Sequence, residues 1–137
     1  MNQVSNLNFN GVFVMEWTIE DDIENGFLQA SMKGMMDFYH YGESMKEILM
    51  HPYWKDSMGL VLDANMLDLS KLRYEDMIRQ SILPGWNEDD KINKHINFIV
   101  ENDLNFGIMR MWNVLSDIPS ELNIHILRNK EFSLLPD

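Results

Sequence analysis

The segment Met58–Asn65, MGLVLDAN, decides the fold. It is short and almost uninterrupted in its apolar side chains, with Asp63 as its one charged residue. A run of this kind is typical of a strand that lies inside a sheet and is covered on both faces. The sequence therefore predicts a sheet with helices packed against it. The segments on either side of Met58–Asn65 should supply those helices and the neighbouring strands.

An antiparallel hairpin is predicted upstream of this segment. Phe13–Glu20 alternates apolar and polar side chains, and Phe27–Gly34 alternates again, which is the period of a half-buried strand. Asn25 and Gly26 lie between the two segments. This pair favours a tight primed turn, because both central residues of such a turn need a positive φ.

Helices and strands alternate along the rest of the chain. From Asp37 the apolar side chains recur at three and four, which predicts an amphipathic helix that Asp37 caps and Pro52 ends. The same patterns predict the elements downstream. They are a helix over 73–83, a strand around 96–100, a helix over 105–117 capped by Asn105, a strand around 124–127 and a final turn over 130–135.

This order predicts an α/β fold in a single domain of residues 12–137, preceded by a flexible lead-in at 1–11. A strand–helix–strand unit joins parallel strands by a right-handed connection. An N-terminal β-hairpin followed by such βαβ crossovers gives a mixed, mostly parallel sheet with about three to four helices. Because the helices are few and short, we expect them to cover one face of the sheet much better than the other.

The overall composition narrows the classes of function. The chain has 11 Lys and Arg against 22 Asp and Glu, a net charge of −11. Such a surface repels phosphate backbones and anionic headgroups, so we expect no nucleic-acid partner. The absence of cysteine excludes a disulfide framework, a thiolate metal site and a cysteine nucleophile. No apolar run reaches the roughly 18 residues of a membrane span, and no secretory signal is evident. A cytoplasmic protein is expected.

Three stretches resemble one known family, the SpoIIAA-like branch of the STAS superfamily, which is also described as STAS/SEC14-like. The resemblance covers nearly the whole chain from Trp17, and it implies a single small α/β domain that acts by docking onto partner proteins. The stretches are GLVLDANMLDLSKL (59–72), HINFIVENDLNFGIMRMW (95–112) and LNIHILRN (122–129). Their most telling pieces are the strand ending in Asp63, the Phe106-Gly107-x-x-Arg110 run and the pair Arg128-Asn129.

In some STAS domains, phosphorylation of a serine at a helix start acts as a switch. The sporulation antagonists carry an Asp-Ser-Ser-Gly-like turn there, whereas this chain has one serine and no glycine in the corresponding segment 65–71. Ser70 is a candidate phosphoacceptor, and a local turn or cap hydrogen bond is the competing explanation. The predicted partner-binding residues are Asp63, Asn65, Asp68, Ser70 and Arg110.

Arg110 admits two interpretations. It falls away from the apolar stripe of its predicted helix. Its stem would then cover apolar surface while its head lies in water or pairs with an acid such as Asp103. The alternative is an anchor for an anionic ligand or a partner carboxylate. Gly107, in the first turn of the same helix, should let the helix approach the sheet closely.

No catalytic residue is predicted. The four histidines share no metal-ligand spacing, and none lies beside an obvious nucleophile. Neither GxSxG, nor a phosphate loop, nor GxGxxG occurs. Asp63, Glu101 and Asp103 should gather at the carboxyl ends of strands, where a magnesium site is imaginable. Solvated loop acids are the simpler explanation, so no metal and no cofactor are predicted.

Methionine is frequent, at 12 of 137 residues. Methionine fills irregular gaps, so a plastic core is one explanation. The alternative is an apolar cavity for a lipid-like molecule, as the SEC14 comparison suggests. The candidate lining residues are Trp54, Trp86, Met109 and Trp112. Trp86 lies beside Pro84-Gly85 and is the tryptophan expected to be exposed.

The sequence thus favours a non-enzymatic, STAS-like regulatory or protein-interaction domain. We expect its contact face to involve the loop 63–70 and the start of the second helix, and an acidic face would favour a basic patch on the partner. The first alternative is a carrier or sensor of a small apolar, lipid-like ligand, and a metal-assisted enzyme is a more distant one. The sequence leaves the oligomeric state open.

Overall fold

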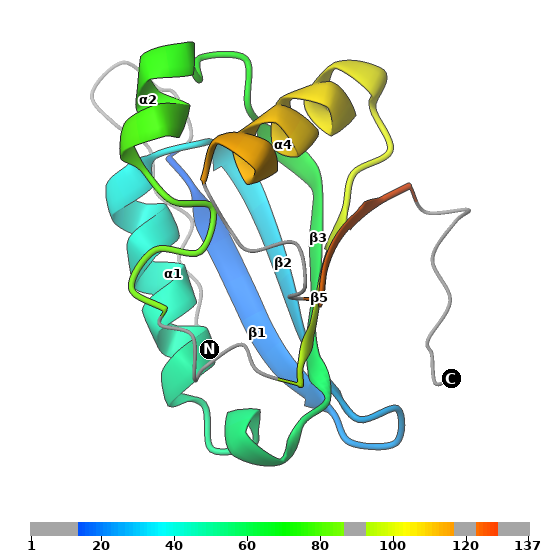
Figure 1. The fold of residues 1–137 in the computed structure, drawn as a ribbon. Helices are drawn as coiled ribbons and strands as arrows, with labels where there is room; N and C mark the ends of the chain where they lie inside the picture. The colour runs from blue at the N-terminus through cyan, green and yellow to red at the C-terminus, as the bar shows by residue number, and fades with distance from the viewer. Residues whose placement is uncertain (1–13, 87–92, 117–122, 129–137) are drawn as a thin grey trace.

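The computed structural model describes residues 14–86, 93–116 and 123–128. They form an α/β fold with one mixed sheet of five strands and three α-helices, as predicted (Figure 1). The predictions for the lead-in at 1–11 and the final turn at 130–135 concern residues outside these ranges. No helix within the described ranges combines the length and the apolar character that a membrane span requires.

The elements follow one another in the predicted order. They are β1 (Glu16–Asp22), β2 (Phe27–Met35), α1 (Phe38–Met50), the 3-10 turn η1 (Trp54–Asp56), β3 (Gly59–Asp68), α2 (Tyr74–Arg79), β4 (His95–Ile99), α4 (Asp103–Leu115) and β5 (Asn123–Leu127). The strand order is β1-β2-β3-β4-β5. β1 and β2 are antiparallel, and each later pair is parallel. β3 is therefore the central strand that its apolar run predicts.

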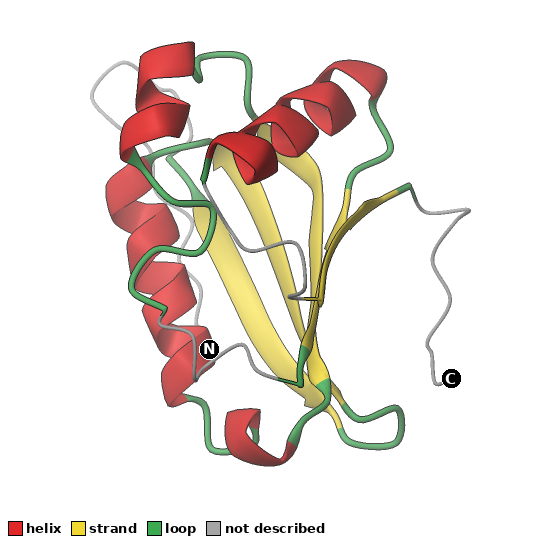
Figure 2. Ribbon diagram, viewed as in Figure 1, coloured by secondary structure: helices red, strands yellow, loops and turns green. Residues whose placement is uncertain are grey.

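All three helices lie on the same face of the sheet (Figure 2). Each strand lies beside its predecessor, and parallel connections are right-handed, so every crossover returns over the same face. The main core lies between this face and the helices. Its fully buried side chains include Leu60 and Leu62 of β3, Met45 of α1 and Trp112 of α4. The opposite face carries a smaller buried cluster of Phe27, Val61 and Ile99, with Leu127 packed against it.

The β1–β2 hairpin is confirmed, but its turn is longer than predicted. Asp22 pairs with Phe27, so residues 23–26 form the loop. The carbonyl of Asp22 accepts hydrogen bonds from the backbone N–H groups of Asn25 and Gly26, at 3.1 and 2.8 Å. Gly26 has a φ of 86°, whereas Asn25 is not among the residues with positive φ. A tight primed turn needs positive φ at two residues, and this loop needs it at the glycine.

α1 begins at the predicted cap. Asp37 accepts a hydrogen bond from the N–H of Tyr39 at 2.9 Å, and its other carboxylate oxygen lies 2.7 Å from Nδ1 of His40. Burial raises the pKa of Asp37, but these hydrogen bonds outweigh it and leave the pKa below its ordinary value of 3.8. Tyr41, Met45 and Ile48 then form the buried face of the helix.

α2 is shorter than the predicted helix over 73–83, because it ends at Arg79. The residues after it form hydrogen bonds with α4 instead of continuing the helix. The carbonyl of Gln80 accepts from Nε1 of Trp112 at 2.7 Å, and the N–H of Ile82 donates to Oγ of Ser116 at 2.9 Å. These contacts hold the end of α2 against the end of α4.

α4 begins earlier than the predicted helix over 105–117. Asn102 is its N-cap, and the side chain of Asn102 accepts a hydrogen bond from the N–H of Asn105 at 3.0 Å. The prediction that Asn105 caps this helix is therefore wrong. Asn105 lies within the helix, and its Nδ2 donates to the carbonyl of Leu67 at 3.0 Å, which joins the start of α4 to the end of β3.

β3 is longer than the predicted strand, because it continues past Asn65 to Asp68. The register between β2 and β3 shifts within it: Ser31 pairs with Asp63, but Lys33 pairs with Met66. β3 thus contains one extra residue, a β-bulge. The bulge turns Leu67 toward the helices, where it is buried. Without it, the alternation of the strand would point Leu67 to the opposite face.

The Asp37 cap provides a stability test. We expect Asp37→Ala to lower the free energy of unfolding by about 1 kcal/mol, because an N–H in the first turn of α1 loses its acceptor. Urea denaturation at pH 7 measures the change. Glu43→Ala, which removes the same charge from the same helix without removing a cap, should have a smaller effect.

The pH dependence of this difference follows from the lowered pKa of Asp37. The ionised carboxylate stabilises the fold above its ordinary pKa, and this contribution is lost as the pH falls through the lowered value. The two stability curves should therefore converge in acid. A difference between wild type and Asp37→Ala that stayed constant down to pH 2 would contradict the assignment.

Candidate functional site

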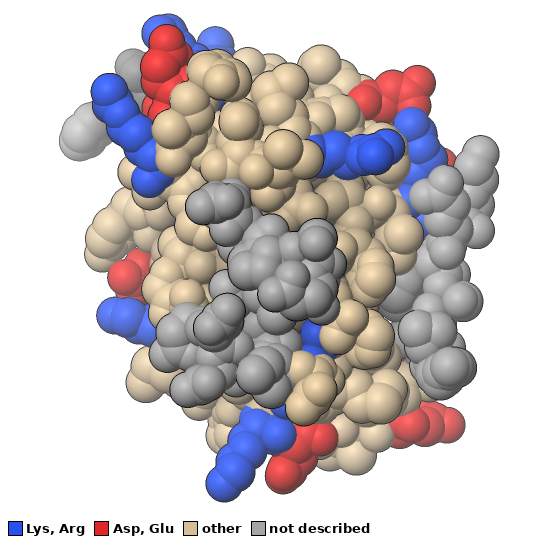
Figure 3. Space-filling model, in the orientation of Figure 1, with Lys and Arg blue, Asp and Glu red and all other residues tan. Residues whose placement is uncertain are grey.

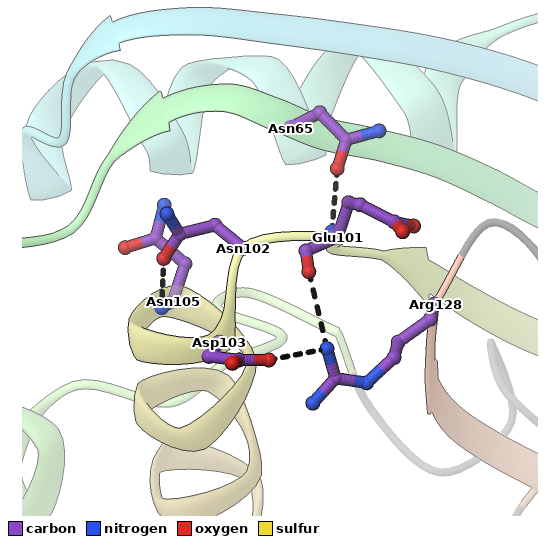
Figure 4. A network of polar contacts seen from close by, with 6 residues as sticks. All are labelled: Asn65, Glu101, Asn102, Asp103, Asn105 and Arg128. Carbon is purple, nitrogen blue, oxygen red and sulfur yellow. Dashed lines mark hydrogen bonds and ion pairs between the residues drawn. The ribbon is translucent and has the colours of Figure 1, made fainter.

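In parallel α/β sheets, ligands favour the carboxyl ends of the strands. In this structure a polar network occupies that place (Figure 4). Its residues come from the ends of β3, β4 and β5 and from the start of α4. They are Asn65, Glu101, Asn102, Asp103, Asn105 and Arg128.

Asn65 joins β3 to the segment that follows β4. Pairing between these strands ends at Asp63 and Ile99. Two residues further on, the side-chain oxygen of Asn65 accepts a hydrogen bond from the N–H of Glu101 at 2.6 Å. The side chain thus provides the hydrogen bond that the ladder no longer supplies. It lies at the bulge of β3, which interrupts the regular pairing there.

Arg128 ties the end of β5 to the connection between β4 and α4. Its Nη1 donates to the carbonyl of Glu101 at 3.2 Å and to a carboxylate oxygen of Asp103 at 2.6 Å. The guanidinium lies over the ring of Phe106, 4.3 Å from the centroid. The side chain of Asp103 is 88% exposed, so the ion pair itself contributes little. These contacts join the ends of the strands to the start of α4, so the network acts as a structural clamp.

Three of the predicted partner-binding residues, Asp63, Asn65 and Asp68, lie in β3 rather than in the loop that the sequence predicted. Asp63 is inside β3 rather than after it, and it is exposed on the face opposite the helices. The expected loop over 63–70 is largely strand, since β3 runs to Asp68. Asp63 accepts a hydrogen bond from the N–H of Asn65 at 3.0 Å. The Asp63 carboxylate thus makes a local hydrogen bond within β3.

Asp68 and Ser70 form a local turn. The Asp68 carboxylate accepts a hydrogen bond from the N–H of Ser70 at 2.9 Å. A further hydrogen bond from the Ser70 side chain and that backbone bond lower the pKa of Asp68, although burial opposes them slightly. Arg110 is exposed on α4, 5.7 Å from the centroid of the Phe106 ring. The five predicted residues are thus divided among the sheet, a turn, the strand-end network and a helix surface.

The predicted ligand-pocket residues, Trp54, Trp86, Met109 and Trp112, are all buried. The expectation that Trp86 is exposed is wrong: 8% of it is accessible, and its ring lies 5.2 Å from that of Trp54. The Trp112 ring packs 5.7 Å from Phe38 and 5.2 Å from Tyr41. None of the four candidates is among the described residues that line the grooves beside β1, β5 and α1.

Two histidines form a pair that the sequence did not predict. His95 of β4 and His125 of β5 stack with ring centroids 5.8 Å apart. Burial and, to a lesser extent, the charge of His95 lower the pKa of His125. The alternation of side chains along β5 places His125 on one face of the sheet. Only the register between β4 and β5 brings His95 beside it. Within the described ranges, no group of three or more histidine and acidic side chains could hold a metal ion.

Comparisons of the chain with protein families, with curated proteins and with solved structures find no match. The resemblance to the SpoIIAA-like STAS branch therefore stays a prediction. The α/β architecture rests on the structure itself.

The histidine pair predicts an acid-sensitive fold. Because the pKa of His125 is lowered in the folded chain, the neutral ring contributes fully above its ordinary pKa of about 6.5. Stability should then fall as the pH drops from that value through the lowered one. Thermal denaturation between pH 7.5 and 5 measures the effect, and His125→Gln should reduce the slope. An unchanged slope in this variant would show that the pair does not couple to folding.

Proposed function

We propose that this chain is a non-enzymatic protein-interaction domain whose contact face is the outer surface of α2 and α4. The observation that carries the proposal is that α4 is apolar on both sides. Met109 and Trp112 face the core, whereas Leu104 and Met111 face solvent. The solvent side of α4 thus carries large apolar side chains next to the charged Asp103 and Arg110, and we expect these apolar side chains to meet a partner.

The exposed apolar side chains are large and lie on adjoining helices. Leu104 and Met111 are 62% and 48% exposed, and Tyr74 and Ile78 of α2 are 57% and 52% exposed. The hydrogen bond between Trp112 and Gln80 holds the two helices together at their C-terminal ends. Clustered exposed apolar side chains mark interaction surfaces more often than isolated ones do.

Gly107 lies between Leu104 and Met111 on the solvent side of α4, and we call these three residues the outer stripe. The expectation that Gly107 lets the helix approach the sheet is wrong, because a Cβ at this position would meet nothing within 4 Å. Gly107 is exposed. It therefore leaves a shallow gap in the outer stripe, into which a partner side chain fits.

The charges around this face have both signs. Arg73, Glu75 and Arg79 of α2 are exposed, as are Asp103 and Arg110 of α4. Figure 3 shows uncharged surface over much of the upper part of this face, with one basic side chain extending across it and other charged side chains at its margins. The expected preference for a basic partner therefore rests on the net charge of the whole chain, and not on the charged residues around this face. A net charge of −11 on every copy opposes self-association, so we assign the face to a different protein.

This face overlaps the predicted contact face at the start of α2. It does not include Asp63, which lies on the opposite side of the sheet. The alternative of a lipid-like ligand has less support, because the tryptophans and Met109 proposed to line a cavity pack into the core. The proposal of a protein partner therefore stands first.

Site-specific photocrosslinking in the native cells tests the contact face. A photoreactive phenylalanine analogue replaces Tyr74, Leu104 or Met111 in turn. We expect crosslinks from these positions to one and the same protein, and Met111→Asp in the Tyr74 variant should reduce the crosslink severalfold. Mass spectrometry identifies the product.

Ile23 provides the matched control, because it is 66% exposed but lies in the β1–β2 loop. The analogue at position 23 should give no crosslink to that protein. Equal crosslinking from position 23, or none from the helices, would reject the proposed face.

A substitution at Gly107 should have opposite effects on stability and on binding. We expect Gly107→Ala to raise the free energy of unfolding by about 1 kcal/mol, because alanine favours an exposed helix interior over glycine. The same variant should weaken capture of the crosslinked partner, since the methyl group fills the gap in the outer stripe. Urea denaturation and a binding titration measure the two effects. A stabilised variant that binds with unchanged affinity would show that the partner does not use the gap.

A further inference from the structure

A second surface lies beside β5, away from the outer stripe. In the sheet formed by the described residues, β5 pairs with β4 alone and is an edge strand. The carbonyl of Leu127 accepts a hydrogen bond from the N–H of Val100, so the backbone groups of Leu127 point toward the β4 side. Successive residues of a strand alternate in this direction. The N–H and C=O groups of Ile124 and Ile126 therefore point to the free edge, as a template for another strand.

A groove of about 330 Å³ runs along this edge. β5 forms one wall through residues 124–127, and α4 forms the other through Arg110, Asn113 and Val114. The wall on the α4 side is apolar at Val114 and basic at Arg110. The unpaired backbone edge of β5 lies along this groove. A groove beside such an edge suits an extended peptide rather than a compact ligand.

Two polar groups in the groove lack partners within the described ranges. The side-chain oxygen of Asn113 is buried without a hydrogen bond. A buried acceptor without a donor is costly, so an Asn113 amide that reorients to accept from a peptide N–H would gain a hydrogen bond. Arg110 makes no ion pair with a described residue, in contrast to Arg128, which pairs with Asp103. The guanidinium of Arg110 is thus available to a carboxylate.

We infer that the groove between β5 and α4 binds an extended peptide segment of a partner protein that carries an aspartate or glutamate. The peptide adds a strand to the sheet by pairing with Ile124 and Ile126. Its alternate side chains pack against Val114, and its carboxylate pairs with Arg110. The groove adjoins the proposed contact face, because Arg110 of α4 lies beside both, but the strand pairing at β5 lies outside that face.

Selection from a displayed library of random heptapeptides, with the intact protein as target, tests the inference. The selected peptides should alternate apolar residues and share an acidic one. In a ¹⁵N–¹H spectrum of the protein, the best peptide should shift the backbone amides of 124–127 and the side-chain amide of Asn113 most. Failure to enrich such peptides overturns the inference, as do shifts confined to α2 and the outer stripe.

Two variants locate the contacts by fluorescence anisotropy. Arg110→Gln should weaken binding of the best peptide about tenfold, the size of one lost charge-assisted hydrogen bond. We then change the acid of that peptide to the amide. The amide peptide should bind the Arg110→Gln variant no more weakly than the original peptide binds that variant. Lys46→Gln, an exposed cation on α1, is the control and should leave affinity unchanged. Equal losses in both variants would indicate long-range attraction only and would overturn the pairing with Arg110.

The backbone pairing has its own test. N-methylation of alternate peptide residues on the pairing edge removes the donors that a strand addition uses, and it should abolish binding. Methylation of the intervening residues should have a much smaller effect. Binding that tolerates both patterns equally would rule out strand addition, whatever the result at Arg110.

The Arg110→Gln variant needs a control for folding. Its ¹⁵N–¹H spectrum should be unchanged away from the groove, which would show that the variant is folded.

Discussion

The handedness of the connections between parallel strands is the constraint on which the rest of this structure depends. Right-handed crossovers joined in simple sequence place every helix on one face of the sheet. One face therefore carries nearly all of the large apolar residues of the core, including those of α1 and α4. The other face buries a much smaller cluster and is polar across β1 and the adjoining part of β2. An alternation of apolar and polar side chains in β1 fits this asymmetry.

The same arrangement fixes where polar groups meet. All parallel strands end at one edge, and their connections to the helices start there. In this chain the strand-end position is closed by Asn65, Arg128 and the first turn of α4. The surfaces left for recognition are consequently on the helices and along the edge strand. A single sheet of this design has two edges, and β5 is the edge whose groove is lined by an arginine, Arg110 of α4.

Local patterns in the sequence predicted the architecture, the element order and the buried face of α1, because each depends on periodicity within one segment. The cap at Asp37 was predictable for the same reason. The end of α2 was not, because it depends on hydrogen bonds with Trp112 and Ser116, which are more than 30 residues away along the chain. Trp86 follows Pro-Gly and suggests an exposed loop, yet the ring packs on Trp54.

The candidate sites show the same limit. Asp63 ends an apolar run in the sequence, but pairing with β2 carries the strand beyond it. The stacking of His95 on His125 and the clamp at Arg128 each need a register between strands that no local pattern specifies. Gly107 was assigned to the buried side of its helix, because glycine in the first turn often marks a close approach. In the structure Met109 and Trp112 face the core, and Gly107 lies on the solvent side of α4.

The bulge in β3 shifts the alternation of apolar and polar side chains by one residue. Before it, the odd-numbered residues of β3 such as Asp63 point away from the helices; after it, the odd-numbered Leu67 points toward them. A relative that lacked the extra residue would need the opposite parity from this point to the start of α2. Its sequence would align with this one only across a one-residue gap at position 64 or 65. Because bulges are conserved within families, that single insertion is a feature by which relatives of this domain can be recognised.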